Sequence, residues 1–153
     1  MSRILVVSQT PTIDTSIYAS GDAIGGLLTF NFSGSDTGYQ GVITKIVVID
    51  KASQAAPLDL ILFDRTFTAT ADQAPFDPTD ADLANCIGHI SIAATDYVAF
   101  NDNSVASKTS GRQLPFYFLL NTGQIFGQLV VRSAPTYAAA TDLTVKVIIE
   151  VDD

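Results

Sequence analysis

Apolar residues recur along the chain in short runs, and each run is bounded by Gly, Pro, Asn, Asp or Ser. Runs of this length with turn residues between them are typical of strands in a sandwich or barrel. The pattern therefore predicts an all-β fold, an antiparallel β-sandwich of about eight strands. The predicted strands are Ala23–Phe32, Gly41–Asp50, Leu58–Phe63, Cys86–Ala93, Ser104–Lys108, Pro115–Leu120, Ile125–Arg132 and Leu143–Val151.

Alternation is clearest in the last run, where aliphatic side chains at every second position from 143 to 151 face one way. The stretch 46–49 is apolar without interruption, which favours a place in the middle of the sandwich for the second strand. The turn residues 121–124, with a glycine at the third position, predict a hairpin between the sixth and seventh strands.

One short helix is predicted near residues 77–84. Asp77 is expected to cap its N-terminus, Pro78 suits its first position, and the next two aspartates lie near its positive end. The same carboxylates raise calcium binding as an alternative. However, the spacing does not match an EF-hand loop, which favours the capping interpretation, and the residues 101–103 are interpreted first as a turn on similar grounds.

At 153 residues the chain has the length of one domain, and we expect residues 1–153 to form one sandwich. Hydrophobic residues make up 47% and charged residues only 16% of the chain. We therefore expect a substantial core, with part of the apolar surplus covered by copies of the chain or by a partner. Cys86 is the only cysteine, so no disulfide can form within the chain.

The net charge of -8 repels phosphate backbones, and no cluster of Lys and Arg offsets it, so direct binding to nucleic acid is not expected. No segment approaches the roughly 20 apolar residues of a membrane helix, so no membrane partner is expected either. The first eight residues contain only four consecutive apolar positions, too few for a signal-peptide core. A cytoplasmic site of folding fits these features.

Groups suited to catalysis are scarce. His89 is the only histidine, and alternation places it on the solvent side of its strand, opposite Ile90 and Ile92. Cys86 falls on the other face, so a buried, inert thiol is expected rather than a Cys–His pair, and a zinc site cannot be assembled within one chain. The glycines of 21–26 lack the Lys-Ser/Thr of a phosphate loop and favour the start of a strand or a bulge. We therefore expect no enzyme, and no catalytic, cofactor-binding or metal-binding residues.

Three stretches together resemble small virion structural proteins of tailed bacteriophages: TPTIDTSIYASGD at 10–22 leading into IGG at 24–26, LDLILFD at 58–64, and APTYA at 134–138 leading into TDLTV at 141–145. The nearest type is the head decoration protein, or cement protein. The resemblance implies a jelly-roll-like sandwich on the outer surface of the capsid that bridges neighbouring major capsid proteins and stabilises the shell. A homotrimer or homodimer is the expected state, and no functional residues can be carried over by position.

The segment 2–19 is the expected capsid contact, because its residues 4–7 are apolar, lie near the terminus and are separated from the first predicted strand by a stretch that contains proline. Residues 1–20 would then form an extended arm that adds a strand to the sheet of a neighbour. The alternative is an ordinary first strand of the sandwich. The candidate contact residues are Ile4, Leu5, Val6, Val7, Ile13 and Tyr18.

Two other classes of function remain open. A tail, baseplate or receptor-binding module of a virion could be built on the same sandwich. A sugar-binding, lectin-like domain or a sandwich enzyme is disfavoured, because the chain has no tryptophan and its histidine stands alone.

Overall fold

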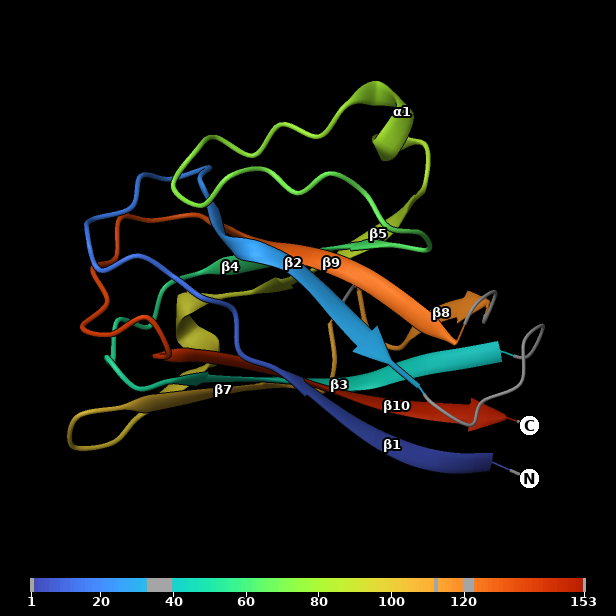
Figure 1. The fold of residues 1–153 in the computed structure, drawn as a ribbon. Helices are drawn as coiled ribbons and strands as arrows, with labels where there is room; N and C mark the ends of the chain where they lie inside the picture. Colours follow the sequence, from blue (N-terminus) through green and yellow to red (C-terminus); the bar gives the residue numbers. More distant parts are fainter. Residues whose placement is uncertain (1, 33–39, 112, 120–122, 153) are drawn as a thin grey trace.

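The computed structural model describes residues 2–32, 40–111, 113–119 and 123–152, which form two antiparallel sheets packed face to face (Figure 1). The all-β sandwich expected from the sequence is confirmed, and its arrangement is jelly-roll-like. The strands are β1 Ser2–Gln9, β2 Ala23–Asn31, β3 Gln40–Asp50, β4 Leu58–Phe63, β5 Cys86–Ile92, β6 Tyr97–Ala99, β7 Ser104–Lys108, β8 Phe116–Leu119, β9 Gln124–Val131 and β10 Leu143–Asp152.

The larger sheet has six strands in the order β1-β10-β3-β7-β6, with β8 paired to β3 beside β7. The smaller sheet has the order β2-β9-β4-β5. β3 thus lies in the interior of its sheet, as its uninterrupted apolar stretch predicted. All eight predicted strands are present, and β1 and β6 are additional.

The core lies between the two sheets and follows the alternation seen in the sequence. In β10 every second residue is fully buried, from Leu143 to Val151. Leu58, Leu60 and Leu62 of β4 close the core from the opposite sheet. Burial of these side chains stabilises the fold by about 2 kcal/mol each.

The predicted hairpin between the sixth and seventh strands is wrong. β8 pairs with β3 in the six-stranded sheet, whereas β9 pairs with β2 and β4 in the four-stranded sheet. Gly123 does have the positive φ that the turn pattern predicted, at 71°. The preceding turn residues 120–122 lie outside the described residues. A local turn signal fixes the bend of the chain and not the sheet to which the next strand belongs.

The short helix is confirmed, but its start differs from the prediction. α1 spans Asp80–Leu83, and its N-cap is Thr79 rather than Asp77. The Thr79 hydroxyl accepts a hydrogen bond from the Asp82 amide at 3.1 Å, which satisfies a donor of the first turn. A short 3-10 helix, η1 Ala94–Asp96, follows β5.

Candidate docking surface

The outward side of the six-stranded sheet is largely apolar. Successive residues of a strand point to opposite faces, so each buried residue of this sheet alternates with one that points away from the core. β-branched aliphatic residues are common at these outward positions, and the polar residues among them include Thr44, Ser107, Thr144, Lys45, Lys146 and Glu150. We call the surface formed by Ile4, Val6, Val42, Val47, Ile49, Val98, Val105, Tyr117, Leu119 and Ile148 the open face.

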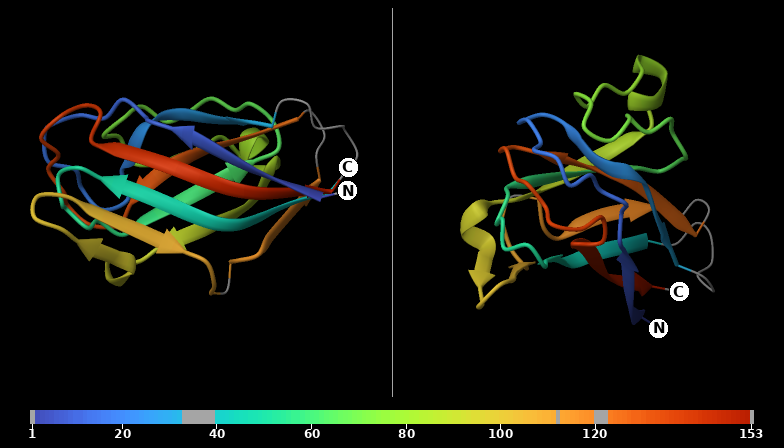
Figure 2. Two further views of the ribbon diagram at one scale, coloured as in Figure 1. Left: turned by 90° about the horizontal axis from the view of Figure 1, so that it is seen from below. Right: turned by 60° about the vertical axis from the view of Figure 1, so that its left-hand side comes forward.

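No described segment of the chain covers the open face. The left view of Figure 2 looks onto β1, β10, β3 and β7, and no described loop or helix crosses in front of them. Among the described residues nine large hydrophobic side chains are exposed, and five of them belong to this surface. The exposed fractions are 71% for Ile4, 62% for Val6, 61% for Val98, 64% for Tyr117 and 56% for Leu119.

The strand register joins these side chains into rows across the sheet. Val98 of β6 lies opposite Val105 of β7, which lies opposite Ile49 of β3. At the other edge Val6 of β1 lies opposite Ile148 of β10. Directly opposite side chains in a sheet are in contact distance, so the apolar residues form two bands, one on β3, β7 and β6 and one on β1 and β10. Thr144, Lys146 and Glu150 of β10 lie between them.

The open face ends beside β8. A shallow hollow of about 320 Å³ opens where β8 meets β3, and it is lined by Gln40, Tyr117, Phe118 and Leu119. Two exposed residues of the open face, Tyr117 and Leu119, thus line a concave site. Concave sites with exposed apolar walls suit the insertion of a partner side chain.

Charge is distributed unevenly between this face and the rest of the molecule. The outward charged residues with described side chains on these strands are Lys45, Lys146 and Glu150. They sum to +1, whereas the whole chain carries -8. The open face therefore lacks the acidic character of the remaining surface and can approach an acidic or neutral partner without strong repulsion.

The outer side of the four-stranded sheet is different, because residues 64–85 fold over it together with α1 (Figure 1). Phe63, Phe67 and Phe126 form a second buried cluster there, and the rings of Phe63 and Phe67 stack at 3.9 Å between centroids. Gln128 of β9 holds this loop: its amide nitrogen donates to the Thr70 and Gly25 carbonyls, and its amide oxygen accepts from the Thr70 amide.

The structure separates the predicted contact residues of the first strand into two groups. Residues 2–9 pair with β10 over their whole length, so here they are the first strand of the sandwich and not an extended arm. Ile4 and Val6 point outward on the open face. Leu5 and Val7 point inward and pack, half-buried, against the core.

Ile13 and Tyr18, the other two predicted contact residues, are 3% and 1% exposed. The Tyr18 hydroxyl donates to an Asp72 carboxylate oxygen at 2.7 Å and accepts from the Asp14 amide at 2.8 Å. Burial is the main cause that raises the pKa of Tyr18 far above its usual value. Both side chains thus hold the loop to the sandwich, and a docked protein cannot reach them because they are buried. The prediction is wrong for these two residues, since an apolar residue in a loop can belong to the core.

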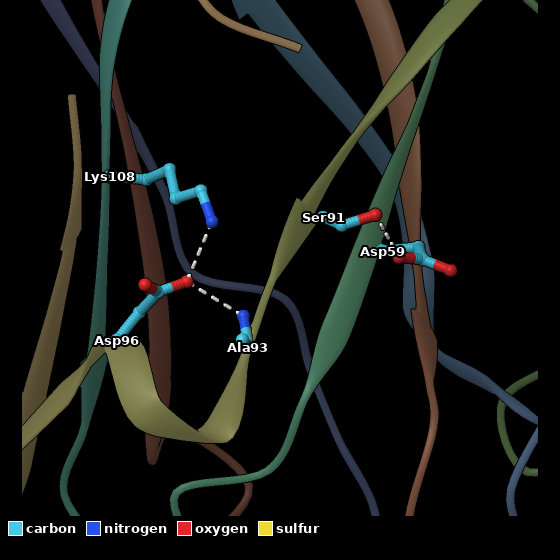
Figure 3. A network of polar contacts seen from close by, with 5 residues as sticks. All are labelled: Asp59, Ser91, Ala93, Asp96 and Lys108. Atoms are coloured by element: carbon cyan, nitrogen blue, oxygen red, sulfur yellow. Dashed lines mark hydrogen bonds and ion pairs between the residues drawn. The ribbon is translucent and has the colours of Figure 1, made fainter. Parts of the chain in front are cut away.

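Many carboxylates of the described residues accept hydrogen bonds from neighbouring segments. Figure 3 shows two such groups: Asp96 accepts from the Lys108 ammonium at 3.0 Å and from the Ala93 amide, and Asp59 accepts from the Ser91 hydroxyl at 2.7 Å. The two groups lie apart in the figure. They tie neighbouring segments together and do not converge on a common site.

Cys86 and His89 lie on the same face, which differs from the prediction. A bulge shifts the register of β5, so that Cys86 lies opposite Phe63 while His89 lies opposite Ile61, and both therefore point outward. His89 is exposed, as expected, whereas Cys86 is only half-buried against the phenylalanine cluster. The sequence signal for this bulge is Gly88, whose φ is 137°.

Among the described residues, no group of three or more His, Cys, Asp or Glu side chains is placed to hold a metal ion. Gly25, in the segment that resembles a phosphate loop, lies at the bulge of β2, as the strand interpretation predicted. A side chain at Gly25 would lie 2.5 Å from a Pro11 carbon, so glycine is required there for packing. In the same described part of the chain, no helix has the length and apolar character needed to cross a membrane.

Comparison with known proteins gives likenesses of structure alone. No model of a known protein family matches the sequence, and no curated protein matches it. A chain of the virus-like particle of giant freshwater prawn Macrobrachium rosenbergii extra small virus is similar with a TM-score of 0.36 and 8% identity, over 100% of this chain and 79% of that one.

A chain of infectious bursal disease virus is similar with a TM-score of 0.41 and 10% identity, over 98% of this chain and 31% of that one. A chain of Desmodium yellow mottle tymovirus is similar with a TM-score of 0.33 and 10% identity, over 98% of this chain and 85% of that one. At these TM-scores the likeness is loose, so function has to be argued from the residues of the chain itself.

Proposed function

We propose that this chain is a structural protein of a virus particle, of the decoration type, and that it binds the major capsid protein through the open face. Its action is contact and not catalysis, and its place is the outer surface of the capsid. The observation that carries the proposal is a six-stranded sheet whose outward side is apolar and uncovered. The three stretches that resemble bacteriophage decoration proteins support the class.

The open face has a suitable size for specific binding. At about 4.8 Å between strands and about 3.3 Å along a strand for each residue, the six strands, which are three to eleven residues long, cover about 650 Å². A stable interface buries about 800 Å² on each partner, so this face can provide most of a binding site. On a shell the same contact is repeated over many copies, and a modest affinity for each contact is then sufficient.

A hydrogen-bonded β-sheet also suits the mechanical role. Its backbone is held by hydrogen bonds on both sides of β10 and β3, so the apolar side chains are presented in a fixed arrangement. Little conformational entropy is lost when such a surface binds. A rigid plate that spans two neighbouring shell subunits would resist their separation.

The test is binding of the purified chain to shells assembled from the major capsid protein encoded alongside it. Val105→Asp places a charge between Val98 and Ile49 in the apolar row of the open face, with no cation directly opposite, and is expected to reduce binding at least about tenfold, since an unpaired buried charge costs well over 1.4 kcal/mol. Ile17→Asp is the control, because Ile17 is 67% exposed but lies in a loop away from this face. Equal binding by both variants, or no binding by the parent chain, would refute the proposal.

The number of copies in purified particles provides an independent measurement. A decoration protein is expected in numbers comparable to the capsid protein. A handful of copies per particle would instead indicate a tail, baseplate or receptor-binding role.

A further inference from the structure

The open edge of β1 differs from the other strand edges of the molecule. An edge strand exposes unpaired main-chain N–H and C=O groups, and soluble proteins usually protect them with short strands, bulges, proline, charged residues or a covering loop. Within the described residues the two sheets end at β1, β2, β5, β6 and β8. Four of these five edges are short, bulged or covered.

The edges of the smaller sheet are both protected. The start of β2 is covered by 72–76: the Ala23 amide donates to the Ala74 carbonyl at 2.8 Å, and the Gly25 amide donates to an Asp72 carboxylate oxygen. β5 carries the bulge at Gly88, and the Phe116 ring lies so close that a side chain at Gly88 would meet it at 2.7 Å. Neither edge presents a regular row of free main-chain groups.

On one side of the larger sheet, β6 has three residues and β8 has four. On the other side, β1 has eight residues in continuous register with β10, and it contains no bulge, glycine or proline. Its outward side chains Ile4 and Val6 are among the most exposed hydrophobic residues of the chain. β1 is therefore long and regular with an apolar centre, and its one charged residue, Arg3, lies near its start, so the central residues favour pairing with another strand.

We infer that β1 pairs with β1 of a second copy of this chain, antiparallel and about a two-fold axis perpendicular to the sheet, so that two six-stranded sheets become one continuous sheet. A two-fold axis of this kind makes the strand its own partner and closes the assembly as a dimer. Two strands of eight residues form on the order of six to eight main-chain hydrogen bonds.

The side chains of β1 fit this arrangement on both faces. With the axis at Leu5, Ile4 of each copy lies opposite Val6 of the other, and Val6 is already opposite Ile148 of β10. Six aliphatic side chains then form one band across the axis on the outward side. On the inward side the Leu5 side chains of the two copies lie opposite each other, and Val7 lies opposite the aliphatic stem of Arg3, so both half-buried side chains gain a neighbour.

The dimer has a consequence that rests on the proposed function. Because the axis is perpendicular to the sheet, the open faces of both copies point in the same direction. One dimer can then bind two sites on a shell at once, which raises the apparent affinity without any new contact.

The first experiment measures the mass of the isolated chain by sedimentation velocity and light scattering. No capsid protein is present, so the result does not depend on whether the proposed function is correct. The parent chain is expected at twice the monomer mass. Ile4→Lys with Val6→Lys should give monomers, because edge lysines oppose strand pairing, while both positions are more than 60% exposed and tolerate the change. The matched control Val98→Lys, on the outward side of β6 and 61% exposed, should remain dimeric.

The second experiment locates the axis by crosslinking. Ile4→Cys, Leu5→Cys and Val6→Cys are made one at a time with Cys86→Ser, and oxidation is followed on a gel. The residue at the axis lies about 4.5 to 5.5 Å from its mate between Cα atoms and should form a disulfide. Val98→Cys in the same background should not. A monomeric or trimeric parent chain, dimers in the double lysine variant, or no crosslink at any of the three positions would overturn the inference.

Discussion

The outer faces of the two sheets both contain apolar residues, but a segment of the chain covers only one of them. On the four-stranded sheet, Phe63 and Phe126 point outward and are at most 6% exposed, because residues 64–85 cover them. On the six-stranded sheet, Ile4, Val6 and Val98 point outward and are more than 60% exposed. The first face is a second core, and the second is an uncovered surface.

The difference shows how exposed apolar area can be interpreted. Covering apolar surface stabilises a fold by about 25 cal/mol for each Å² removed from water. The chain obtains this stabilisation on one side with its own loop and not on the other. Uncovered apolar faces of several hundred Å² are unusual on monomers and mark interaction sites. We therefore assign stability to the covered face and binding to the open face, which three changes can test.

The largest effect is expected on the covered face. Phe63→Ala removes a fully buried ring that stacks on Phe67, and it should lower the free energy of unfolding by about 3 to 5 kcal/mol. Tyr117→Ala on the open face should change it by less than about 0.5 kcal/mol, because Tyr117 is 64% exposed. Urea denaturation of both variants measures the two values. Similar losses would remove the distinction between the faces.

An intermediate effect is expected where the covering loop is attached. Gln128→Ala removes three hydrogen bonds to buried groups of Thr70 and Gly25, and it should lower the free energy of unfolding by about 2 to 4 kcal/mol. Amide hydrogen exchange in residues 66–76 should accelerate, since the loop loses its anchor. Gln54→Ala is the control, because Gln54 is exposed. Unchanged exchange in the loop would show that Gln128 does not hold it.

The smallest effect on stability is expected on the open face itself. Ile49→Thr and Val105→Thr keep β-branched side chains on neighbouring strands and reduce the apolar surface. Each should lower the free energy of unfolding by less than about 1 kcal/mol while reducing binding of a hydrophobic dye. Calorimetry and dye fluorescence measure the two effects. A loss comparable to that of Phe63→Ala would mean that this face contributes to the core.

Several features of the fold could be predicted because the sequence signals were local. β10 was recognised because alternation from Leu143 to Val151 has one explanation, a strand with one side buried. β1 was harder, because apolar side chains on both of its faces remove the alternation and resemble a binding segment. Its partner, β10, lies at the opposite end of the chain, so only tertiary structure could identify it.

The residues of the open face could be predicted only in part, because an apolar run in the sequence does not show which of its side chains are buried. Ile4 and Val6 were among the predicted contact residues and lie on the open face, but Ile13 and Tyr18 are buried. Most of the open face was missed, although the uninterrupted stretch 46–49 contained two of its residues. An apolar residue pointing outward in a strand has the same sequence signal as one pointing into a core.

The sequence by itself determined the elements: short apolar runs and turn residues specify strands, since side-chain alternation and backbone bending are local properties. Which strands pair, and which apolar face the chain covers, was decided only by the tertiary structure. Those outcomes depend on contacts between residues far apart in sequence, as between β1 and β10 or between Gln128 and Thr70. The uncovered face, on which the proposed function depends, is therefore a property of the fold as a whole.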